Sequence, residues 1–470
     1  MSFNSITFLV FISLFFLFWP LVKRKQNTRF LFIIFSSFVF YGWWDWRFLF
    51  LILFSGLVDY FAAIFIAKQP KRARFYLILS LCVNLASLSV FKYSTFIASQ
   101  IETFLQFADV TIDLQNQLPP FTLILPVGIS FYTFQSMSYT IDVYNGKLKP
   151  TNNILHFFSY LVMFPQLVAG PIVRAKDFLS QLTINRKISG LEFWNGIKLI
   201  LLGYFQKTVL ADNLGVFVDT AFAGVDNLSG IYWWIVMSCF AFQIYFDFSG
   251  YSQIARGLAK LMGYHFRMNF NHPYLATSLK DFWSRWHISL STWFRDYVYI
   301  PLGGAKFGKS KSNLNMWITM LLSGLWHGAA LNFVLWGGYH AAILSLERLL
   351  KRYFGNLGLK HLGLFGWGIT MIQVLIGWVF FRATSMDQIK YIFKNMFLLE
   401  FDLSFIDNNI NVMVFLVLAI FYECGYYFVK KAPIVRNQLG YQMEVIVYAL
   451  ILASIIFFRG PEKEFIYFQF

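Results

Sequence analysis

The chain consists mostly of long apolar stretches separated by short polar or basic segments. A helix that crosses a bilayer needs about 20 predominantly apolar residues. The pattern predicts membrane-spanning helices over residues 3–22, 30–44, 47–67, 75–93, 121–144, 193–211, 231–250, 315–333, 334–350, 363–382, 411–429 and 442–459. Three further segments are apolar but too short or too rich in polar residues to cross the bilayer, and they fit re-entrant or interfacial helices: 154–170, 255–263 and 286–300. We therefore predict an all-α polytopic membrane protein that forms a single membrane domain over residues 1–470.

The composition supports lipid as the main solvent of this chain. Hydrophobic residues make up 58% of the sequence and charged residues only 13%, whereas soluble domains carry about 25% charged residues. A net charge of +16 in a soluble protein would suggest a nucleic-acid partner. Here the basic residues lie in short loops between apolar stretches, where they set topology and contact the headgroups of membrane lipids. We therefore expect no nucleic-acid partner.

The distribution of Lys and Arg also predicts an orientation. Several loops are basic: 23–29, 68–74, 172–187, 256–311, 348–352 and 430–436. By contrast, 99–120 and 212–230 contain acidic residues and no Lys or Arg. Because basic loops are retained in the cytoplasm, both termini are expected on the periplasmic side. The first apolar stretch is followed, not preceded, by basic residues, so we interpret it as a retained span and not as a cleaved signal peptide.

Several familiar kinds of chemistry have no support in the sequence. Cys82, Cys239 and Cys424 are isolated within apolar segments, so we expect buried free thiols and neither disulfides nor a metal site. Phosphate-binding glycine loops, HExxH and the GxSxG elbow are not found. The remaining candidates for chemistry are histidines and charged residues beside apolar segments, because ionisable groups inside a bilayer are costly and usually functional.

His327 is the first candidate and lies in the apolar run SGLWHGAALNFV. Its small neighbours Gly324, Gly328 and Ala329 would let another helix or a substrate approach closely. A buried imidazole stays neutral and can accept a proton, which suits a general base that activates a hydroxyl. The alternative is a core histidine bonded to a backbone carbonyl. We favour the catalytic interpretation.

His287 is the second candidate and lies in DFWSRWHISLSTWFRD. If this segment is helical, turn spacing gathers polar side chains around the ring: Arg285, Ser289, Thr292 and Asp296. Asp296 or a serine hydroxyl could orient the imidazole, while Arg285 and Arg295 could bind a phosphate or carboxylate of a substrate. The alternative is an interfacial helix with tryptophan anchors and arginines that reach the headgroups. That alternative accounts for Trp286 better than for His287.

Other residues carry weaker signals. Asp247, in FDFSGYS at the end of a predicted span, needs a partner, for which Arg256 or a backbone cluster is available; it either lines a substrate path or is structural. Gly250 beside it suggests a broken or closely packed helix. Trp286 and Trp326, each next to a candidate histidine, could contact substrate or donor. His340 is either a second proton relay or a packed core residue, and we favour the core.

One long run and three shorter ones carry a resemblance to a known family. Residues 246–304, FDFSGYSQIARGLAKLMGYHFRMNFNHPYLATSLKDFWSRWHISLSTWFRDYVYIPLGG, resemble the membrane-bound O-acyltransferase (MBOAT) family, more narrowly its alginate O-acetyltransferase branch. FPQLVAGPIVRAKDFLSQL, GLWHGAALNFV and the early FYGWWDWRFL are similar to the same branch. The resemblance covers about residues 1–385, whereas the last ~85 residues match only in being hydrophobic.

The resemblance implies a fold and an activity. It implies a ring of about 11–12 transmembrane helices with re-entrant helices, an MBOAT core over about residues 120–385, and funnels from both membrane faces that meet near His327. His327 would be the catalytic histidine and His287 the second position of the site. The implied donor is acetyl-CoA, with no bound cofactor. The implied acceptor is a hydroxyl on a periplasmic SGNH-type acetyltransferase or on a polysaccharide such as alginate or peptidoglycan, at a bacterial inner membrane.

A rival function is a transporter or flippase for a glycan or lipid-linked intermediate. It would use the same intramembrane His and Asp residues as a proton relay. Inverted repeats would support it, and we find none in the sequence. A purely structural scaffold would have no reason to keep ionisable groups at depth. We therefore predict an O-acetyltransferase.

Overall fold

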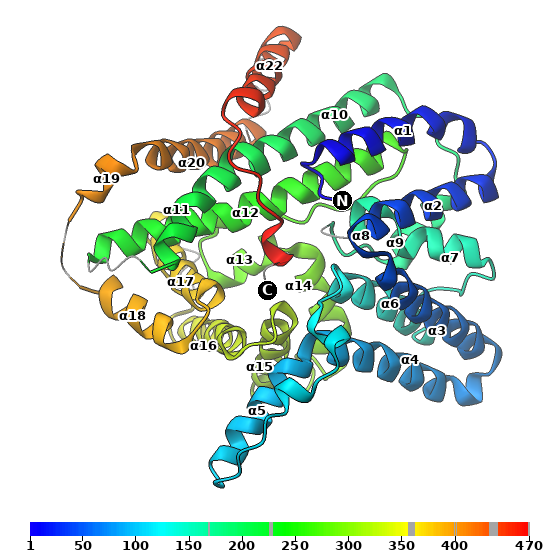
Figure 1. Ribbon diagram of the computed structural model, residues 1–470, viewed down its shortest axis with the longest axis horizontal. Helices are drawn as coiled ribbons and strands as arrows, with labels where there is room; N and C mark the ends of the chain where they lie inside the picture. The colour runs from blue at the N-terminus through cyan, green and yellow to red at the C-terminus, as the bar shows by residue number, and fades with distance from the viewer. Residues whose placement is uncertain are drawn as a thin grey trace. The chain divides into compact units, whose positions relative to one another are not determined.

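The computed structural model describes residues 1–167, 170–224, 229–355, 362–398, 400, 402–431 and 440–468. These residues form helices joined by short loops, with no β-strand among them, so the predicted all-α class is confirmed (Figure 1). The chain folds into two compact units. The first comprises Met1–Gly196, Leu258–Arg267 and Gly328–Ala330, and the second comprises Ile197–Gly257, Met268–His327 and Leu331–Phe470. The expectation of a single membrane domain stays a prediction.

The first unit contains the helices of the N-terminal part of the chain. Its α-helices are α1 (Ile6–Val22), α2 (Gln26–Asp45), α3 (Leu49–Lys68), α4 (Ala73–Leu88), α5 (Ser94–Gln106), α6 (Ile129–Tyr144), α7 (Ile154–Leu161), α8 (Phe164–Leu167) and α9 (Ala175–Thr183). Short 3₁₀ or π turns join them: η1 (Trp46–Phe48), η2 (Pro70–Arg72), η3 (Ser89–Tyr93), η4 (Gln115–Gln117) and η5 (Pro120–Leu123). Helix α10 (Gly190–Tyr204) begins in this unit and ends in the second.

A buried carboxylate fixes the packing of α3, α4 and α6. Asp59 lies in the middle of α3 and is fully buried. Its carboxylate accepts hydrogen bonds from the hydroxyls of Ser80 on α4 and Ser136 on α6, and from the Asn84 amide at 3.0 Å. A buried polar group is stable only when it is hydrogen-bonded. This network explains why an aspartate is tolerated inside the predicted span 47–67.

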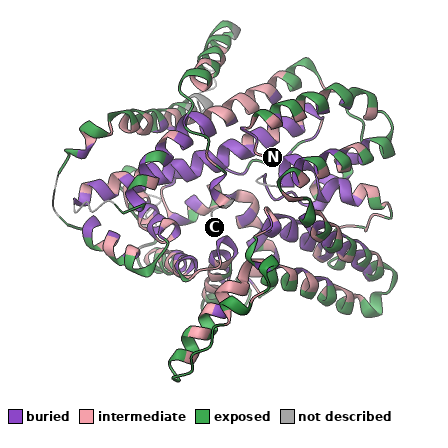
Figure 2. Ribbon diagram, in the orientation of Figure 1, coloured by how far each residue is buried: buried purple, intermediate pink, exposed green. Residues whose placement is uncertain are grey.

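The second unit contains the remaining elements, apart from residues 258–267, which belong to the first unit. They are η6 (Phe205–Ala211), α11 (Asp212–Phe222), α12 (Gly230–Leu261), η7 (Pro273–Leu275), α13 (Leu279–Arg285), α14 (Ile288–Phe294), η8 (Arg295–Tyr299), α15 (Gly308–His327), α16 (Leu331–Phe354), α17 (Gly363–Arg382), α18 (Met386–Met396), α19 (Phe405–Asn408), α20 (Ile410–Lys431), α22 (Tyr441–Phe457) and η11 (Ile466–Phe468). Helix α12 is largely buried, whereas α22 is largely exposed (Figure 2).

Glycines set the closest helix contacts in this unit. A Cβ at Gly250 of α12 would lie 2.7 Å from the Gly203 carbonyl oxygen of α10. A Cβ at Gly324 of α15 would collide with the Phe333 carbonyl of α16, and one at Gly337 of α16 would collide with the Met320 carbonyl. Small residues let backbones approach in this way. The close packing predicted around Gly250 and Gly324 is therefore present, and α12 is not broken at Gly250.

Four helical stretches among the described residues are long and apolar enough to cross a membrane: Gln26–Lys68, Pro70–Gln106, Gly230–Leu261 and Gly363–Arg382. Shorter apolar helices cover Ile6–Val22, Ile410–Gly425 and Gln442–Phe457. The predicted span 363–382 coincides with α17, and the piece at 255–263 proves to be the end of α12, not a separate helix. The ring of about 11–12 spans stays a prediction.

The expectation of buried thiols is correct for one cysteine. Cys239 on α12 is buried, Cys424 on α20 is half-buried, and Cys82 on α4 is exposed. All three are free thiols. Cys82 was expected to be buried and is exposed, for a simple reason. A helix side that faces lipid is as apolar as one that faces the core, so hydrophobic neighbours do not separate the two cases.

Candidate active site

His327 is the last residue of α15, and the following helix α16 begins at Leu331. The predicted span 315–333 is therefore wrong at its C-terminal end, because the helix stops at the histidine. The side chain is buried, with 3% of the residue exposed. Four aromatic rings surround the imidazole, and their centroids lie 5.0–5.7 Å from it: Trp326, Trp336, Phe381 and Tyr467. The histidine thus lies at the turn of a closely packed helical hairpin.

His287 lies between two short helices and not inside one. It caps the N-terminus of α14 with a φ of +42°, in the left-handed region that non-glycine residues rarely adopt. Strain of this kind persists only where the surrounding structure enforces it. The residue is fully buried, and its Nδ1 lies 3.3 Å from Oδ1 of Asn269. Burial lowers the pKa of the imidazole to about 3, so the ring is neutral at pH 7.

The helical spacing on which the predicted polar cluster around His287 depended is therefore wrong. Because the helix is interrupted at His287, turn spacing does not apply across it. Asp296 bonds the guanidinium of its neighbour Arg295 at 2.7 Å, and the oxygen that meets the His287 ring belongs to Asn269. Ser289 also donates to that Asn269 oxygen, at 2.9 Å. Asn269 was missed because it precedes His287 by 18 residues and no spacing rule connects the two.

The two histidines share two aromatic neighbours. The Trp326 ring centroid lies 6.0 Å from His287 and 5.0 Å from His327. The corresponding distances for Tyr467 are 6.4 Å and 5.7 Å. Both sequence blocks therefore meet at one place in the second unit. Trp326, predicted as a contact residue, lies at that place.

The other predicted donor-contact residues have partners of their own. Arg285 bonds Asp281 at 2.9 Å, one helical turn away, and Arg295 bonds Asp296. Trp286 is buried, and its ring centroid lies 4.9 Å from that of Trp378 on α17. Trp286 is therefore neither an anchor at the membrane interface nor an exposed contact residue, because its ring belongs to the aromatic core. The two arginines are partly exposed, and their role in binding the donor stays a prediction.

Asp247 is in the middle of α12 and not at the end of a span, because that helix continues to Leu261. Its partner is Lys207 at 2.7 Å and not Arg256, whose guanidinium donates to Gln253. Lys207 also pairs with Asp212 at 2.8 Å. All three members of this ion network are buried. A lysine inside the predicted span 193–211 was the signal that could have revealed it.

The C-terminal segment reaches the same place. Beyond α22 the chain runs back towards α12 (Figure 1). Phe465 and Ile466 are buried there, and the Ile466 amide donates to Asp247 at 2.6 Å. Tyr467 follows, beside both imidazoles. Burial and the nearby Asp247 carboxylate raise the pKa of Tyr467, so its phenol stays protonated. Sequence reasoning missed this residue because the last ~85 residues showed only hydrophobicity.

His340 behaves as the packed core residue that we favoured. It is buried on α16, and its ring lies 4.7 Å from Trp336 and 5.1 Å from Trp283. Among the described residues, no three His, Cys, Asp or Glu side chains cluster so that they could hold a metal. The groups available for chemistry at the site are thus two imidazoles, one phenol and the nearby ion network.

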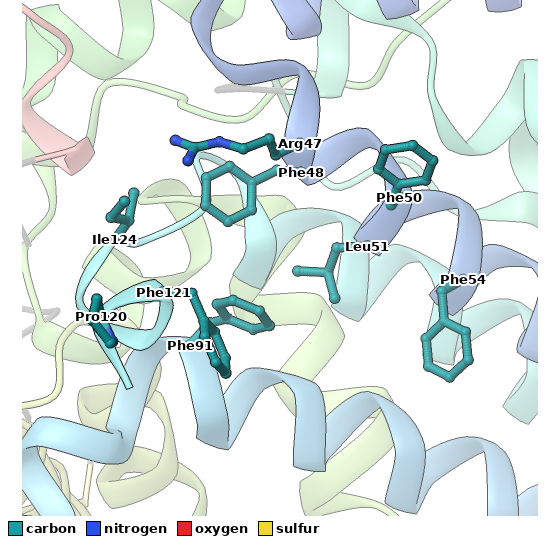
Figure 3. Close-up of a pocket in the computed structure, with 9 residues that line it drawn as sticks. All are labelled: Arg47, Phe48, Phe50, Leu51, Phe54, Phe91, Pro120, Phe121 and Ile124. Atoms are coloured by element: carbon teal, nitrogen blue, oxygen red, sulfur yellow. The ribbon is translucent and has the colours of Figure 1, made fainter. Parts of the chain in front are cut away.

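A cavity of about 530 Å³ in the first unit has a different character (Figure 3). Its lining is apolar apart from one arginine: Arg47, Phe48, Phe50, Leu51, Phe54, Phe91, Pro120, Phe121 and Ile124. The guanidinium of Arg47 pairs with Asp45 at 2.6 Å. Because none of these side chains can act as a proton acceptor or a nucleophile, we do not assign the reaction to this groove.

Comparison with known proteins decides the family. The family model described as MBOAT, membrane-bound O-acyltransferase family, matches residues 151–386. A protein named "Probable alginate O-acetylase AlgI" of Pseudomonas aeruginosa is 39% identical over 411 residues, which cover 84% of this chain and 75% of that protein. The chain belongs to the membrane-bound O-acyltransferase family. It is therefore a multi-pass membrane O-acyltransferase, and the transporter interpretation is set aside.

Two further relatives show the range of this family. A peptidoglycan O-acetyltransferase of Helicobacter pylori is 32% identical and matches 78% of this chain and 73% of its own length. A teichoic acid D-alanyltransferase of Bacillus subtilis is 29% identical and matches 51% of this chain and 63% of its own length. His287 and His327 both lie within residues 151–386 that match the MBOAT model, whereas Tyr467 lies beyond them.

Proposed function

We propose that this MBOAT protein transfers an acetyl group from acetyl-CoA in the cytoplasm to a hydroxyl on the periplasmic side of the bacterial inner membrane. The observation that carries the proposal is the meeting of two buried imidazoles, His327 and His287, at one place within the region that matches the family model. Relatives named for acetyl transfer match a larger share of the chain than the D-alanyltransferase does. This difference favours an acetyl donor.

The chemistry needs one proton acceptor beside the two reactants. The acceptor oxygen attacks the carbonyl carbon of the thioester while the His327 imidazole takes the hydroxyl proton. The carbon–sulfur bond then breaks, and the leaving thiolate recovers that proton from the imidazolium. A positioned general base contributes about 10²–10⁴-fold, and the alignment of two reactants contributes roughly 7–11 kcal/mol. Positioning is therefore the larger part of catalysis, and buried, closely packed walls suit it.

The acceptor follows from the names of the relatives. Alginate and peptidoglycan are polysaccharides outside the inner membrane, so we propose a secreted or cell-wall polysaccharide as the final acceptor. A periplasmic SGNH-type acetyltransferase would receive the acetyl group first and pass it on. With basic loops in the cytoplasm, both termini lie in the periplasm. Arg285 and Arg295, which are partly exposed beside His287 in the sequence, are candidates for the phosphates of the donor.

The test is acetyl transfer by the purified full-length chain in proteoliposomes, with radiolabelled acetyl-CoA on one side and the partner or glycan on the other. We expect His327→Ala to fold normally and to lose at least 100-fold in transfer rate, because the general base is gone. His265→Ala is the matched control, since His265 is exposed, and it should retain full activity. Near-normal transfer by His327→Ala would refute the catalytic role, and no transfer by the unmodified chain with any acyl-CoA would refute the donor.

A further inference from the structure

Asn269 occupies an unusual position beside the strained histidine. It is buried, and its main-chain carbonyl accepts from the Ile288 amide at 2.8 Å. Two residues further on, the Asn271 amide donates to the Arg285 carbonyl at 3.0 Å. These two backbone hydrogen bonds bracket His287, one on each side of it in the sequence. The segment that contains Asn269 therefore holds the histidine backbone in its left-handed conformation.

The orientation of the Asn269 amide follows from its partners. Its Oδ1 faces the backbone N–H of Ser289 at 3.1 Å, and a backbone N–H can only donate. The Ser289 hydroxyl donates to the same oxygen at 2.9 Å. The Nδ2 group faces the Ser252 hydroxyl at 3.5 Å, where it can donate. A flipped amide would set two donors against each other, so Oδ1 is the atom that meets the His287 ring.

An amide oxygen has no proton to give, so Nδ1 of His287 must carry the proton in this contact. In a neutral imidazole the other nitrogen, Nε2, then holds the lone pair. We propose that Asn269 is a positioning residue that fixes His287 in the Nδ1–H tautomer, so that Nε2 is the nitrogen that accepts a proton during acyl transfer. This inference rests on the proposed function for its catalytic consequence, but the tautomer itself is a property of the resting protein.

Asn269 supplies the side-chain oxygen that the structure places at Nδ1 of His287, and the backbone of His287 itself also forms a hydrogen bond with the ring. The ring neighbours of the imidazole in the described chain are Phe248, Phe270, Trp326 and Tyr467. Three of them carry no proton acceptor that could bind Nδ1–H. Tyr467 is the titratable group among them, and its phenol stays protonated. The side-chain oxygen that an observed contact places at Nδ1 is Oδ1 of Asn269, at 3.3 Å.

The consequence is a division of labour between the two histidines. His287 cannot donate a hydrogen bond to a substrate from Nε2 while it remains neutral in this tautomer. It can accept a hydrogen bond there, or hold the proton that His327 takes from the acceptor hydroxyl until the leaving thiolate recovers it. A carboxylate in place of the Asn269 amide would still accept from Nδ1–H and would stabilise the imidazolium, so Asn269→Asp tests the role by changing charge and not shape.

The decisive experiment is nitrogen NMR of the full-length chain with ¹⁵N-labelled histidine in lipid, with His287→Gln used to assign the His287 signals. We expect the unmodified protein to show His287 protonated at Nδ1 alone at pH 7.5. Asn269→Leu should give a mixture of tautomers or Nε2–H. Ser252→Ala is the matched control, because it removes the partner of Nδ2 and leaves Oδ1 in place, so Nδ1–H should persist. An Nε2–H resting state, or a tautomer unaffected by Asn269→Leu, would overturn the proposal.

The catalytic half has its own readout, the pH profile of acetyl transfer. We expect Asn269→Asp to move the acidic limb of kcat/KM to higher pH by one unit or more, whereas Asn269→Leu should lower kcat at least 10-fold with little change in KM. If the acidic limb of the kcat/KM profile does not move although the NMR tautomer is as expected, His287 does not accept a proton during transfer. The catalytic part of the proposal is then wrong. If the unmodified chain shows no acetyl transfer, the proposed function is refuted, whereas the NMR result on the tautomer still holds.

Discussion

The Asp247 carboxylate accepts a hydrogen bond from the backbone amide of Ile466 at 2.6 Å, so the middle of α12 holds the segment around Ile466. The same carboxylate pairs with Lys207, whose second partner is Asp212. A charge network inside the second unit therefore positions the segment that brings Tyr467 to the two histidines.

Removing that carboxylate should release the C-terminal segment. In Asp247→Ala the buried Ile466 amide loses its acceptor, which costs about 1–3 kcal/mol, and Lys207 keeps one carboxylate instead of two. We expect a lower melting temperature and faster trimming of the last residues by carboxypeptidase, read by intact-mass spectrometry. Asp387→Ala, at an exposed carboxylate, is the control. Trimming at the unmodified rate would show that Asp247 does not anchor the segment.

Tyr467 should contribute through its hydroxyl as well as its ring. The ring lies beside both imidazoles, and its phenol stays protonated, so the hydroxyl can serve as a hydrogen-bond donor at the site. Tyr467→Phe keeps the ring and removes only the hydroxyl. We expect a loss of at least 10-fold in acetyl transfer with an unchanged melting temperature, which is within the range of acid–base contributions. Full activity in this variant would limit Tyr467 to packing.

The helical hairpin that ends at His327 should tolerate no added methyl group at its closest contact. In Gly324→Ala the new Cβ collides with the Phe333 carbonyl, and overpacking of this kind costs typically 1–3 kcal/mol. His327 lies three residues further on, so we expect transfer to fall together with stability. Gly338→Ala on α16 is the matched control, because its Cβ would meet only the Leu321 side chain at 3.8 Å. Equal melting temperatures for the two variants would contradict the close approach.

Acid should destabilise the protein partly through His287. Burial depresses the pKa of this imidazole from about 6.5 in the unfolded chain to about 3 in the folded one. A depressed pKa contributes stability that is fully present above pH 6.5 and declines by about 1.4 kcal/mol per pH unit as the pH falls towards 3. We expect His287→Gln to lose less melting temperature than the unmodified chain between pH 7.5 and 5.0. His265→Gln should show the unmodified acid sensitivity, and an equal loss in all three proteins would argue against a neutral, buried His287.

The sequence by itself determined the class of the protein and the two blocks that carry its chemistry. Apolar stretches of membrane length, sparse charge and the resemblance over residues 246–304 were local properties, and each is visible in consecutive residues. They gave the all-α class, the O-acyltransferase family, and His327 and His287 as candidates. Even the special environment of His327 was indicated locally, since Gly324 beside it predicts close helix packing.

Tertiary structure decided the partners of those residues. Helical spacing suggested Asp296 as the partner of His287. The left-handed backbone of His287 interrupts the helix there, and the imidazole contacts Asn269 instead. Likewise, Asp247 and Tyr467 are 220 residues apart, and only folding of the C-terminal segment against α12 brings them into one site. Hydrogen bonds and ring contacts act over a few ångströms of space, whereas sequence patterns report neighbours along the chain, so distant partners emerge only when the chain is folded.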